Sequence, residues 1–130
     1  MVILDTSFLF AFFNETDEHH AEAVRLTPSL EGDLIYFPFL VFQELMTLIM
    51  SRYSSSEAVR ISEILLDGEF PAQIFKVDID YLKESVALFR ELGQHKLSFV
   101  DVSLIVLARE FSAKVITFDR GLKTALQKSI

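Results

Sequence analysis

Short apolar segments that are typical of buried strands alternate with longer helical segments along the whole sequence. We expect strands at residues 2–4, 34–37, 73–77 and 114–118. Helices are expected at residues 8–13, 16–27, 39–52, 54–66, 79–92, 99–111 and 121–127. This alternation predicts an α/β fold, a three-layer α/β/α sandwich around a central parallel sheet of four to five strands.

The size and composition of the chain suit one compact domain. The sequence has 130 residues, and we find no linker, repeat or low-complexity segment that divides it. We therefore expect residues 1–130 to form a single domain. The hydrophobic share is 51%, with 13 phenylalanines, which exceeds the usual share for a soluble domain. This is enough apolar material for a large core and for an interface between two copies.

The composition also excludes several classes of protein. Cysteine is absent, so disulfides and thiolate metal sites are excluded. Asp5 breaks the N-terminal apolar run and no basic segment precedes it, so we expect no secretory signal. No uninterrupted apolar stretch approaches the ~18 residues of a membrane span. We therefore expect a cytoplasmic protein that does not associate with a membrane.

Four carboxylates stand in apolar surroundings. Asp5 and Asp119 follow the apolar runs of the first and last expected strands, whereas Glu44 and Asp101 interrupt apolar helical segments. Because the carboxyl ends of parallel strands share one edge of a sheet, Asp5 and Asp119 are expected at the same edge. Asp101 shares the core-facing stripe of its helix with Leu104, three residues on. Burying a lone carboxylate is costly, so each of these acids needs a partner.

Three of the four acids also have a local explanation. Asp5 and Asp119 could each cap the helix that follows. The segment Ser98-Phe99-Val100-Asp101 has the spacing of a capping box, with Asp in place of the preferred Glu. Glu44 has no such explanation, because Arg52 lies eight residues along the same helix and is out of reach. Four acids therefore need four separate explanations, whereas one shared divalent cation would serve all of them.

The chemistry of this set favours a hard cation. A carboxylate-rich, all-oxygen set suits Mg²⁺ or Mn²⁺ and is a poor match for zinc or copper. Such ions bind substrate phosphates and activate water for phosphodiester hydrolysis. The net charge of −7 counts against a protein that binds nucleic acid by electrostatics alone. It counts less against a metal-dependent nuclease, because bound ions offset the negative cluster.

The same residues resemble the PIN domain family. The resemblance is carried, in order, by Leu4-Asp5-Thr6-Ser7, Gln43-Glu44-Leu45, Ser98-Phe99-Val100-Asp101 and Thr117-Phe118-Asp119-Arg120-Gly121-Leu122. Many members are Mg²⁺- or Mn²⁺-dependent ribonucleases with an α/β/α fold. A domain of this size looks most like the toxin of a VapBC-type toxin–antitoxin pair. The resemblance thus implies an RNA substrate, a small antitoxin partner and a homodimer.

The resemblance also assigns roles by position. Asp5, Glu44, Asp101 and Asp119 are expected to be the catalytic, metal-binding acids. Thr6 and Thr117 are expected to orient these ligands or a water molecule, as residues behind metal ligands commonly do. Some members carry a further acid shortly after the last one, where this sequence has Arg120-Gly121. The number of metal ions therefore stays open.

Cations near the expected sheet edge are candidates for contact with RNA. Arg120 and Lys123 follow the last acid, and His95 and Lys96 precede the Asp101 helix. We expect Arg120 and Lys123 to contact the substrate, with ordinary solvated cations as the alternative.

Other readings of the sequence stay open at this stage. A PIN-like nuclease of RNA processing fits the same acids, and a non-catalytic PIN-like domain that binds proteins fits the acidic charge. Another phosphoryl-transfer fold, a receiver or an Asp-nucleophile phosphatase, would also place Asp5 after the first strand. The phosphatase pattern, however, wants a second Asp where Ser7 stands, and a receiver wants a late Lys where the sequence has Arg120.

Overall fold

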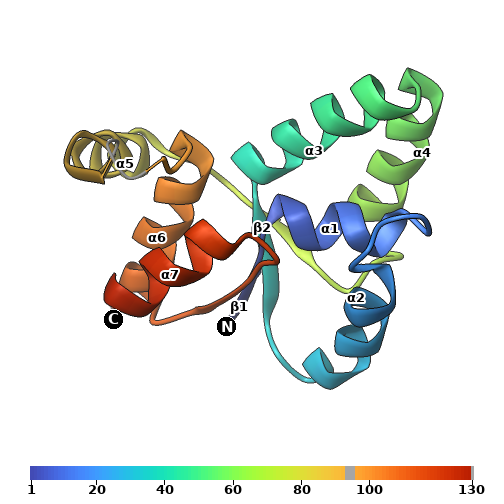
Figure 1. Cartoon of the computed structure of the whole chain (residues 1–130), viewed down its shortest axis with the longest axis horizontal. Coiled ribbons are helices and arrows are strands. Elements are labelled where there is room, and N and C mark those ends of the chain that lie inside the picture. The colour runs from blue at the N-terminus through green and yellow to red at the C-terminus, as the bar shows by residue number, and fades with distance from the viewer. Residues whose placement is uncertain (93–95, 130) are drawn as a thin grey trace.

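A four-stranded parallel sheet forms the centre of the protein, as the sequence predicts. The computed structural model describes residues 1–92 and 96–129 (Figure 1). The strands are β1 (Val2–Leu4), β2 (Ile35–Pro38), β3 (Gln73–Phe75) and β4 (Lys114–Ile116), in the spatial order β3-β2-β1-β4. Every neighbouring pair is parallel, so each connection must cross over the sheet.

Two groups of helices provide these crossovers. Figure 1 shows α5, α6 and α7 on one side of the sheet and α1, α2 and α4 on the other, with α3 running across toward α4. The bounds are α1 Thr6–Phe13, α2 His20–Leu26, η1 Thr27–Leu30, α3 Phe39–Arg52, α4 Ser55–Leu66, α5 Ile79–Leu92, α6 Phe99–Phe111 and α7 Arg120–Ser129. This arrangement confirms the expected α/β/α architecture. Among the described residues, no helix is long and apolar enough to cross a membrane.

The apolar segments of the sequence form one core around β1 and α6. The three residues of β1 and seven consecutive residues of α6, Val102 to Ala108, are buried. Phe8 of α1 and Phe37 of β2 are fully buried beside them in the same core. The high hydrophobic content is therefore used first to cover both faces of a parallel sheet.

One helix begins later than the sequence suggests. We expected a helix from Thr16, whereas α2 begins at His20. The Asp17 side chain accepts a hydrogen bond from the His19 N–H (2.8 Å), and its carbonyl accepts one from the His20 N–H (3.0 Å). This local turn takes the place of the first helical turn, because Asp satisfies nearby N–H groups outside a helix.

The register of the sheet determines which side chains meet at its carboxyl edge. Leu4 of β1 is paired with Ile116 of β4, so Asp5 and Thr117 are the next residues on adjacent strands. The Asp5 N–H donates to the Ile116 carbonyl (3.1 Å), which extends the pairing by one residue. The first expected acid therefore lies beside the segment that leads to the last one.

Candidate functional site at the carboxyl edge of the sheet

Asp5 is a buried carboxylate whose side-chain partners are hydroxyl groups. Its relative exposure is 3%. Its Oδ2 atom accepts hydrogen bonds from Thr117 Oγ1 (2.6 Å) and Ser7 Oγ (2.9 Å). Its side chain makes no capping hydrogen bond to α1, so the helix-cap explanation for Asp5 is wrong. Burial raises the pKa of Asp5, hydrogen bonds from Thr117, Ser7 and the Thr6 backbone oppose the rise, and the charge of Asp119 adds to it.

Ser7 and Thr117 form a small hydroxyl network behind this carboxylate. Their oxygens lie 3.1 Å apart. Ser7 Oγ also accepts from the Phe118 N–H (2.9 Å), and Thr117 Oγ1 accepts from the Asp119 N–H (3.0 Å). The network thus joins the start of α1 to the segment after β4. Thr117 takes the position expected of it, whereas the role of Ser7 was missed in the sequence.

Thr6 does not share in this network. The residue is 5% exposed, and its Oγ1 atom has no hydrogen-bond partner among the described residues. The side chain was expected to orient a ligand or water, and no described contact with Asp5 through that hydroxyl supports the expectation. A buried hydroxyl without a partner costs about 1–3 kcal/mol.

Asp101 is both a helix cap and a perturbed acid. Its Oδ2 accepts from the Ser98 N–H (3.0 Å), while Ser98 Oγ accepts from the Asp101 N–H (3.1 Å). The capping box read from the sequence is therefore confirmed. Burial, together with the negative charges of Asp5 and Asp119, raises the pKa of Asp101 to about 6, against the opposing effect of the hydrogen bonds with Ser98. The capping role thus coexists with electrostatic coupling to both other aspartates.

Asp119 is the exposed member of the group. Its Oδ1 accepts from the Leu122 N–H (2.8 Å), the bond of a residue that caps α7. A Cβ atom at Gly121 would lie 3.3 Å from the same oxygen. The small residue after Arg120 therefore leaves room for this carboxylate against the first turn of α7.

Glu44 lies across a groove from the start of α6. The side chain is half-buried on α3, where we expected an apolar stripe to enclose it. The groove has a volume of about 460 Å³ and is lined by Leu40, Gln43, Glu44, Thr47, Leu48, Ser51 and Val100. Val100 directly precedes Asp101, so Glu44 faces the same region of α6. The pKa shifts of Asp5 and Asp101 have no contribution from Glu44.

The structure thus couples Asp5, Asp101 and Asp119 by charge. Within residues 1–92 and 96–129, no three Asp, Glu or His side chains lie close enough together to hold a metal ion. Asp101 and Asp119 each hold a helix N-terminus with one carboxylate oxygen. Without a positive counter-charge, neighbouring carboxylates repel one another. The oxygen donors nevertheless fit a hard divalent ion, and Asp5 has no ion pair with any described cation.

The cations expected to contact a substrate point in different directions. Lys123 Nζ lies 5.9 Å from the centre of the Phe118 ring, and Lys123 also lowers the pKa of Glu22 through its charge. The His19 ring also stacks on Phe118, with the ring centroids 4.5 Å apart. Arg120 lines a separate groove along α7. Lys96 has a left-handed backbone (φ 61°), and His95 lies outside the described residues.

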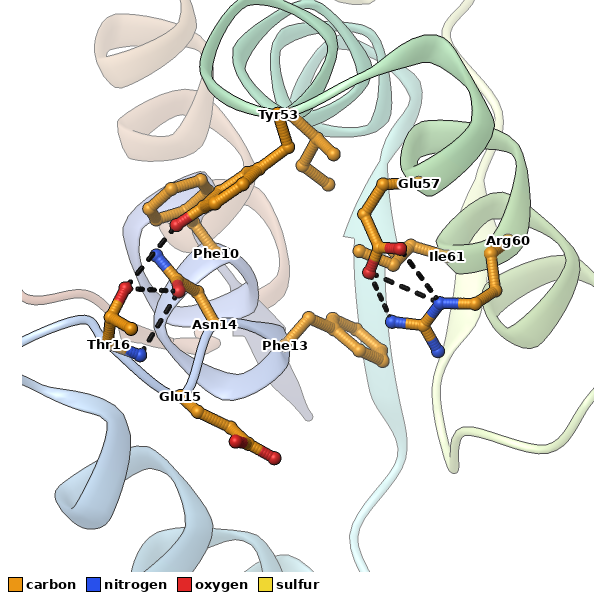
Figure 2. A pocket seen from close by; sticks show the side chains of 10 residues that line it. Phe10, Phe13, Asn14, Glu15, Thr16, Tyr53, Glu57, Arg60 and Ile61 are labelled. Carbon is orange, nitrogen blue, oxygen red and sulfur yellow. Dashed lines mark hydrogen bonds and ion pairs between the residues drawn. The ribbon is translucent and has the colours of Figure 1, made fainter.

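A second hollow lies at the far end of α1 from Asp5. Figure 2 shows this pocket, which has a volume of about 320 Å³ and lies among α1, α3 and α4. Its walls carry Phe10, Phe13 and Tyr53, and the Glu57–Arg60 ion pair closes one side. The charges of this pair offset each other. The pocket therefore combines apolar rings with this ion pair and with the Glu15 carboxylate.

The raised pKa values predict an unusual pH dependence of stability for the metal-free protein. The folded state holds a proton on Asp101 up to about pH 6, whereas the unfolded state releases it near 3.8, the ordinary pKa of an aspartate. The protonated Asp101 side chain therefore contributes to the stability of the folded state below the unfolded pKa. That stability is lost as the pH rises through the folded pKa. Asp5 acts in the same direction. We expect Asp101→Asn to raise Tm in the presence of a chelator near neutral pH and to leave it unchanged near pH 4. Equal effects at both pH values in calorimetry would contradict this account.

The fold and its edge define a parallel α/β domain in which carboxylates gather where the strands end. Residues 2–125 match the PIN domain family, and the chain belongs to that family. A search of curated proteins found no match to the sequence.

Several solved structures share this fold. VapC20 of Mycobacterium tuberculosis, a Sarcin-Ricin loop cleaving toxin, has a TM-score of 0.85 at 23% identity, over 96% of this chain and 95% of that one. VapBC2 from Rickettsia felis, bound to a DNA fragment from its promoter, has a TM-score of 0.69 at 16% identity, over 95% and 92%. FitAcB from Neisseria gonorrhoeae has a TM-score of 0.67 at 18% identity, over 98% and 94%. At these identities the likeness establishes the fold.

Proposed function

We propose that this protein is a metal-dependent endoribonuclease and the toxin subunit of a toxin–antitoxin pair, with residues 1–130 forming its single nuclease domain. The observation that carries the proposal is Asp5, a carboxylate that is 3% exposed, bound by two hydroxyl groups and coupled by charge to Asp119. Asp101 is coupled to both. A protein keeps such a costly group where it needs negative charge for binding or catalysis.

In this proposal the metal is held by carboxylates of the sheet edge. Asp5, Asp101 and Asp119 would hold Mg²⁺ or Mn²⁺, and Glu44 would contribute from across its groove. When bound, the ion supplies Lewis-acid stabilisation of the phosphate and a water of lowered pKa. The chain's own residues hold the carboxylates in place: Thr117 and Ser7 orient Asp5, and burial keeps competing water away from it.

The relatives in complexes support a protein partner. FitAcB and VapBC2 have this fold, and each name joins two protein components. This supports a small antitoxin as the partner of this protein. We also propose a cytoplasmic homodimer. Phe39, Ile74 and Ile79 are 48%, 36% and 64% exposed, and a groove of about 510 Å³ includes the first two. Exposed apolar side chains in such a group are typical of an interface between copies.

The proposed activity is tested by incubating the purified protein with single-stranded RNA in Mg²⁺ or Mn²⁺, with and without a chelator. We expect internal cleavage that stops when the chelator is added, because the ion is needed at the carboxylates. An intact substrate under all conditions, with the protein folded by circular dichroism, would favour a non-catalytic PIN domain that binds proteins.

Loss of the Thr117 hydroxyl should weaken the site without unfolding the protein. Thr117→Val keeps the shape of the side chain and removes the donor to Asp5 and the acceptor of the Asp119 N–H. We expect cleavage to fall about 10- to 100-fold, as is usual for groups that orient metal ligands. Thr27→Val is the matched control, because the hydroxyl of Thr27 donates only to the Ala23 carbonyl far from the acids. Equal rates for the two variants would contradict this role.

A further inference from the structure

The C-terminal helix has a net positive charge, whereas the protein as a whole has a net negative charge. The protein has a net charge of −7, yet α7 (Arg120–Ser129) contains Arg120, Lys123 and Lys128 and no acidic residue. Lys123 is turned toward Phe118 and Glu22. The other two cations share a different face of α7 with Gly121, Thr124 and Ala125, at the spacing of one helical stripe.

This face of α7 forms one wall of a groove. The groove has a volume of about 580 Å³. Leu92, at the end of α5, and Leu97, just before α6, also line it. Arg109, in the last turn of α6, is the third cation of the lining. Glu91 and Glu110 occur on the same helices, but neither lines the groove. Among the residues that the structure describes, the lining therefore carries three positive charges and no negative one.

These cations are not engaged elsewhere within the described chain. The ion pairs among the described residues join His19 to Glu18, Arg25 to Glu22 and Arg60 to Glu57. Arg109, Arg120 and Lys128 have no carboxylate within ion-pair distance in that part of the chain, and all three are exposed. Like charges that share a groove repel one another, so an arrangement of this kind favours a bound anion.

The groove begins at the carboxylate site. Arg120 and Gly121 directly follow Asp119, and Gly121 lies against the Asp119 carboxylate. Arg120 and Lys128 are eight residues apart, which spans ~12 Å along a helix. That length exceeds one phosphate group and suits a chain of phosphates that leads away from the acids.

We propose that the groove formed by Arg109, Arg120 and Lys128, here called the α7 groove, binds the phosphate backbone of the RNA strand next to the bond that is cut. This inference rests on the proposed ribonuclease function and assigns Arg109 and Lys128 to substrate binding. Contacts to phosphates do not read bases, so the α7 groove contributes affinity and direction of the strand rather than sequence preference. The apolar lining supplied by Leu92 and Leu97 lowers the local dielectric and strengthens these contacts.

The test is the binding of a fluorescein-labelled single-stranded RNA, measured by anisotropy over a series of salt concentrations, with a chelator present so that the strand stays intact. The variant is Arg109→Gln with Lys128→Gln. Each phosphate contact contributes about −0.7 to the slope of log K against log salt for single strands, so the double variant should lose ~1.4 from that slope. We expect Kd to rise about tenfold or more, to the same extent for two RNA sequences of different composition.

The matched control is Lys83→Gln with Lys114→Gln, which removes the same charge from exposed positions outside the α7 groove. Equal Kd values and equal salt slopes for the two double variants would contradict the proposal that the α7 groove binds RNA. A loss confined to one of the two RNA sequences would also overturn it, because it would indicate base contacts. The cleavage assay separates this outcome from failure of the proposed function. If the wild-type protein cuts no RNA, the ribonuclease proposal fails, and the anisotropy result still decides whether the groove binds RNA.

Discussion

Asp5→Asn and Asp101→Asn should each reduce RNA cleavage by about 10³-fold or more, because each change removes a charge that stabilises the transition state through the metal. Both side chains keep their shape, and Asn can still accept the hydrogen bonds that the carboxylates accept now. The measurement is the single-turnover rate at saturating Mg²⁺ or Mn²⁺.

The stability of these variants separates a chemical loss from unfolding. Asp5 is buried without a cation beside it, so removal of its charge should leave the metal-free protein at least as stable near neutral pH. Asp80→Asn is the matched control, because Asp80 lies exposed in the first turn of α5. Cleavage that survives both Asp5→Asn and Asp101→Asn would show that these carboxylates do not carry the reaction.

Phe8→Ala should destabilise the protein by about 3–5 kcal/mol, the usual cost of deleting a buried phenyl ring. Phe8 is 0% exposed, and its ring stacks on Phe12 at 6.5 Å and on Phe118 at 6.0 Å. The ring therefore supports both the start of α1 and the segment between Thr117 and Asp119. Chemical denaturation of wild type and variant gives the difference in the free energy of unfolding.

Phe89→Ala is the control for ring removal. Phe89 is 37% exposed on α5 and contacts Phe99 edge to face at 5.6 Å. We expect a smaller loss there, because much of this ring remains in water in the folded state. Similar losses for the two variants would contradict the central place of Phe8 in the core.

Much of the fold was open to sequence reasoning because its signals are local. The buried strands are short apolar runs, and parallel pairing follows from the helices between them. Local patterns also predicted the capping box at Ser98 and Asp101. The later start of α2 was missed, because the Asp17 turn competes with the helix and both use the same residue types.

The candidate site was less accessible, because it depends on contacts between distant residues. Asp5 and Asp119 could be placed at one edge, since both were expected to follow strands of the same parallel sheet. Ser7 is 110 residues from Thr117, and its contact with Thr117 depends on the register of β1 and β4 and on where α1 begins. Glu44 was read from the apolar residues of its own helix, whereas the groove beside it is completed by Val100 of α6.

The positions of the cations also depend on contacts that the sequence does not show. Arg120 and Lys123 are close in the sequence and were grouped for that reason. In the structure, however, the two side chains go to different places: Lys123 lies over the Phe118 ring, whereas Arg120 lines the α7 groove. Arg109 has no sequence signal at all, because its relation to α7 arises from the packing of α6 against α7.

Calorimetric titration with Mn²⁺ near neutral pH shows whether the acids at the carboxyl edge of the sheet hold a divalent cation. We expect binding by the wild-type protein, weakened at least about tenfold in Asp5→Asn, Asp101→Asn and Glu44→Gln and retained in Asp80→Asn. Binding should also weaken as the pH falls through about 6, the pKa of Asp101, because protons compete for the carboxylates. No binding by the wild type, or equal binding by the wild type and the three site variants, would contradict the account.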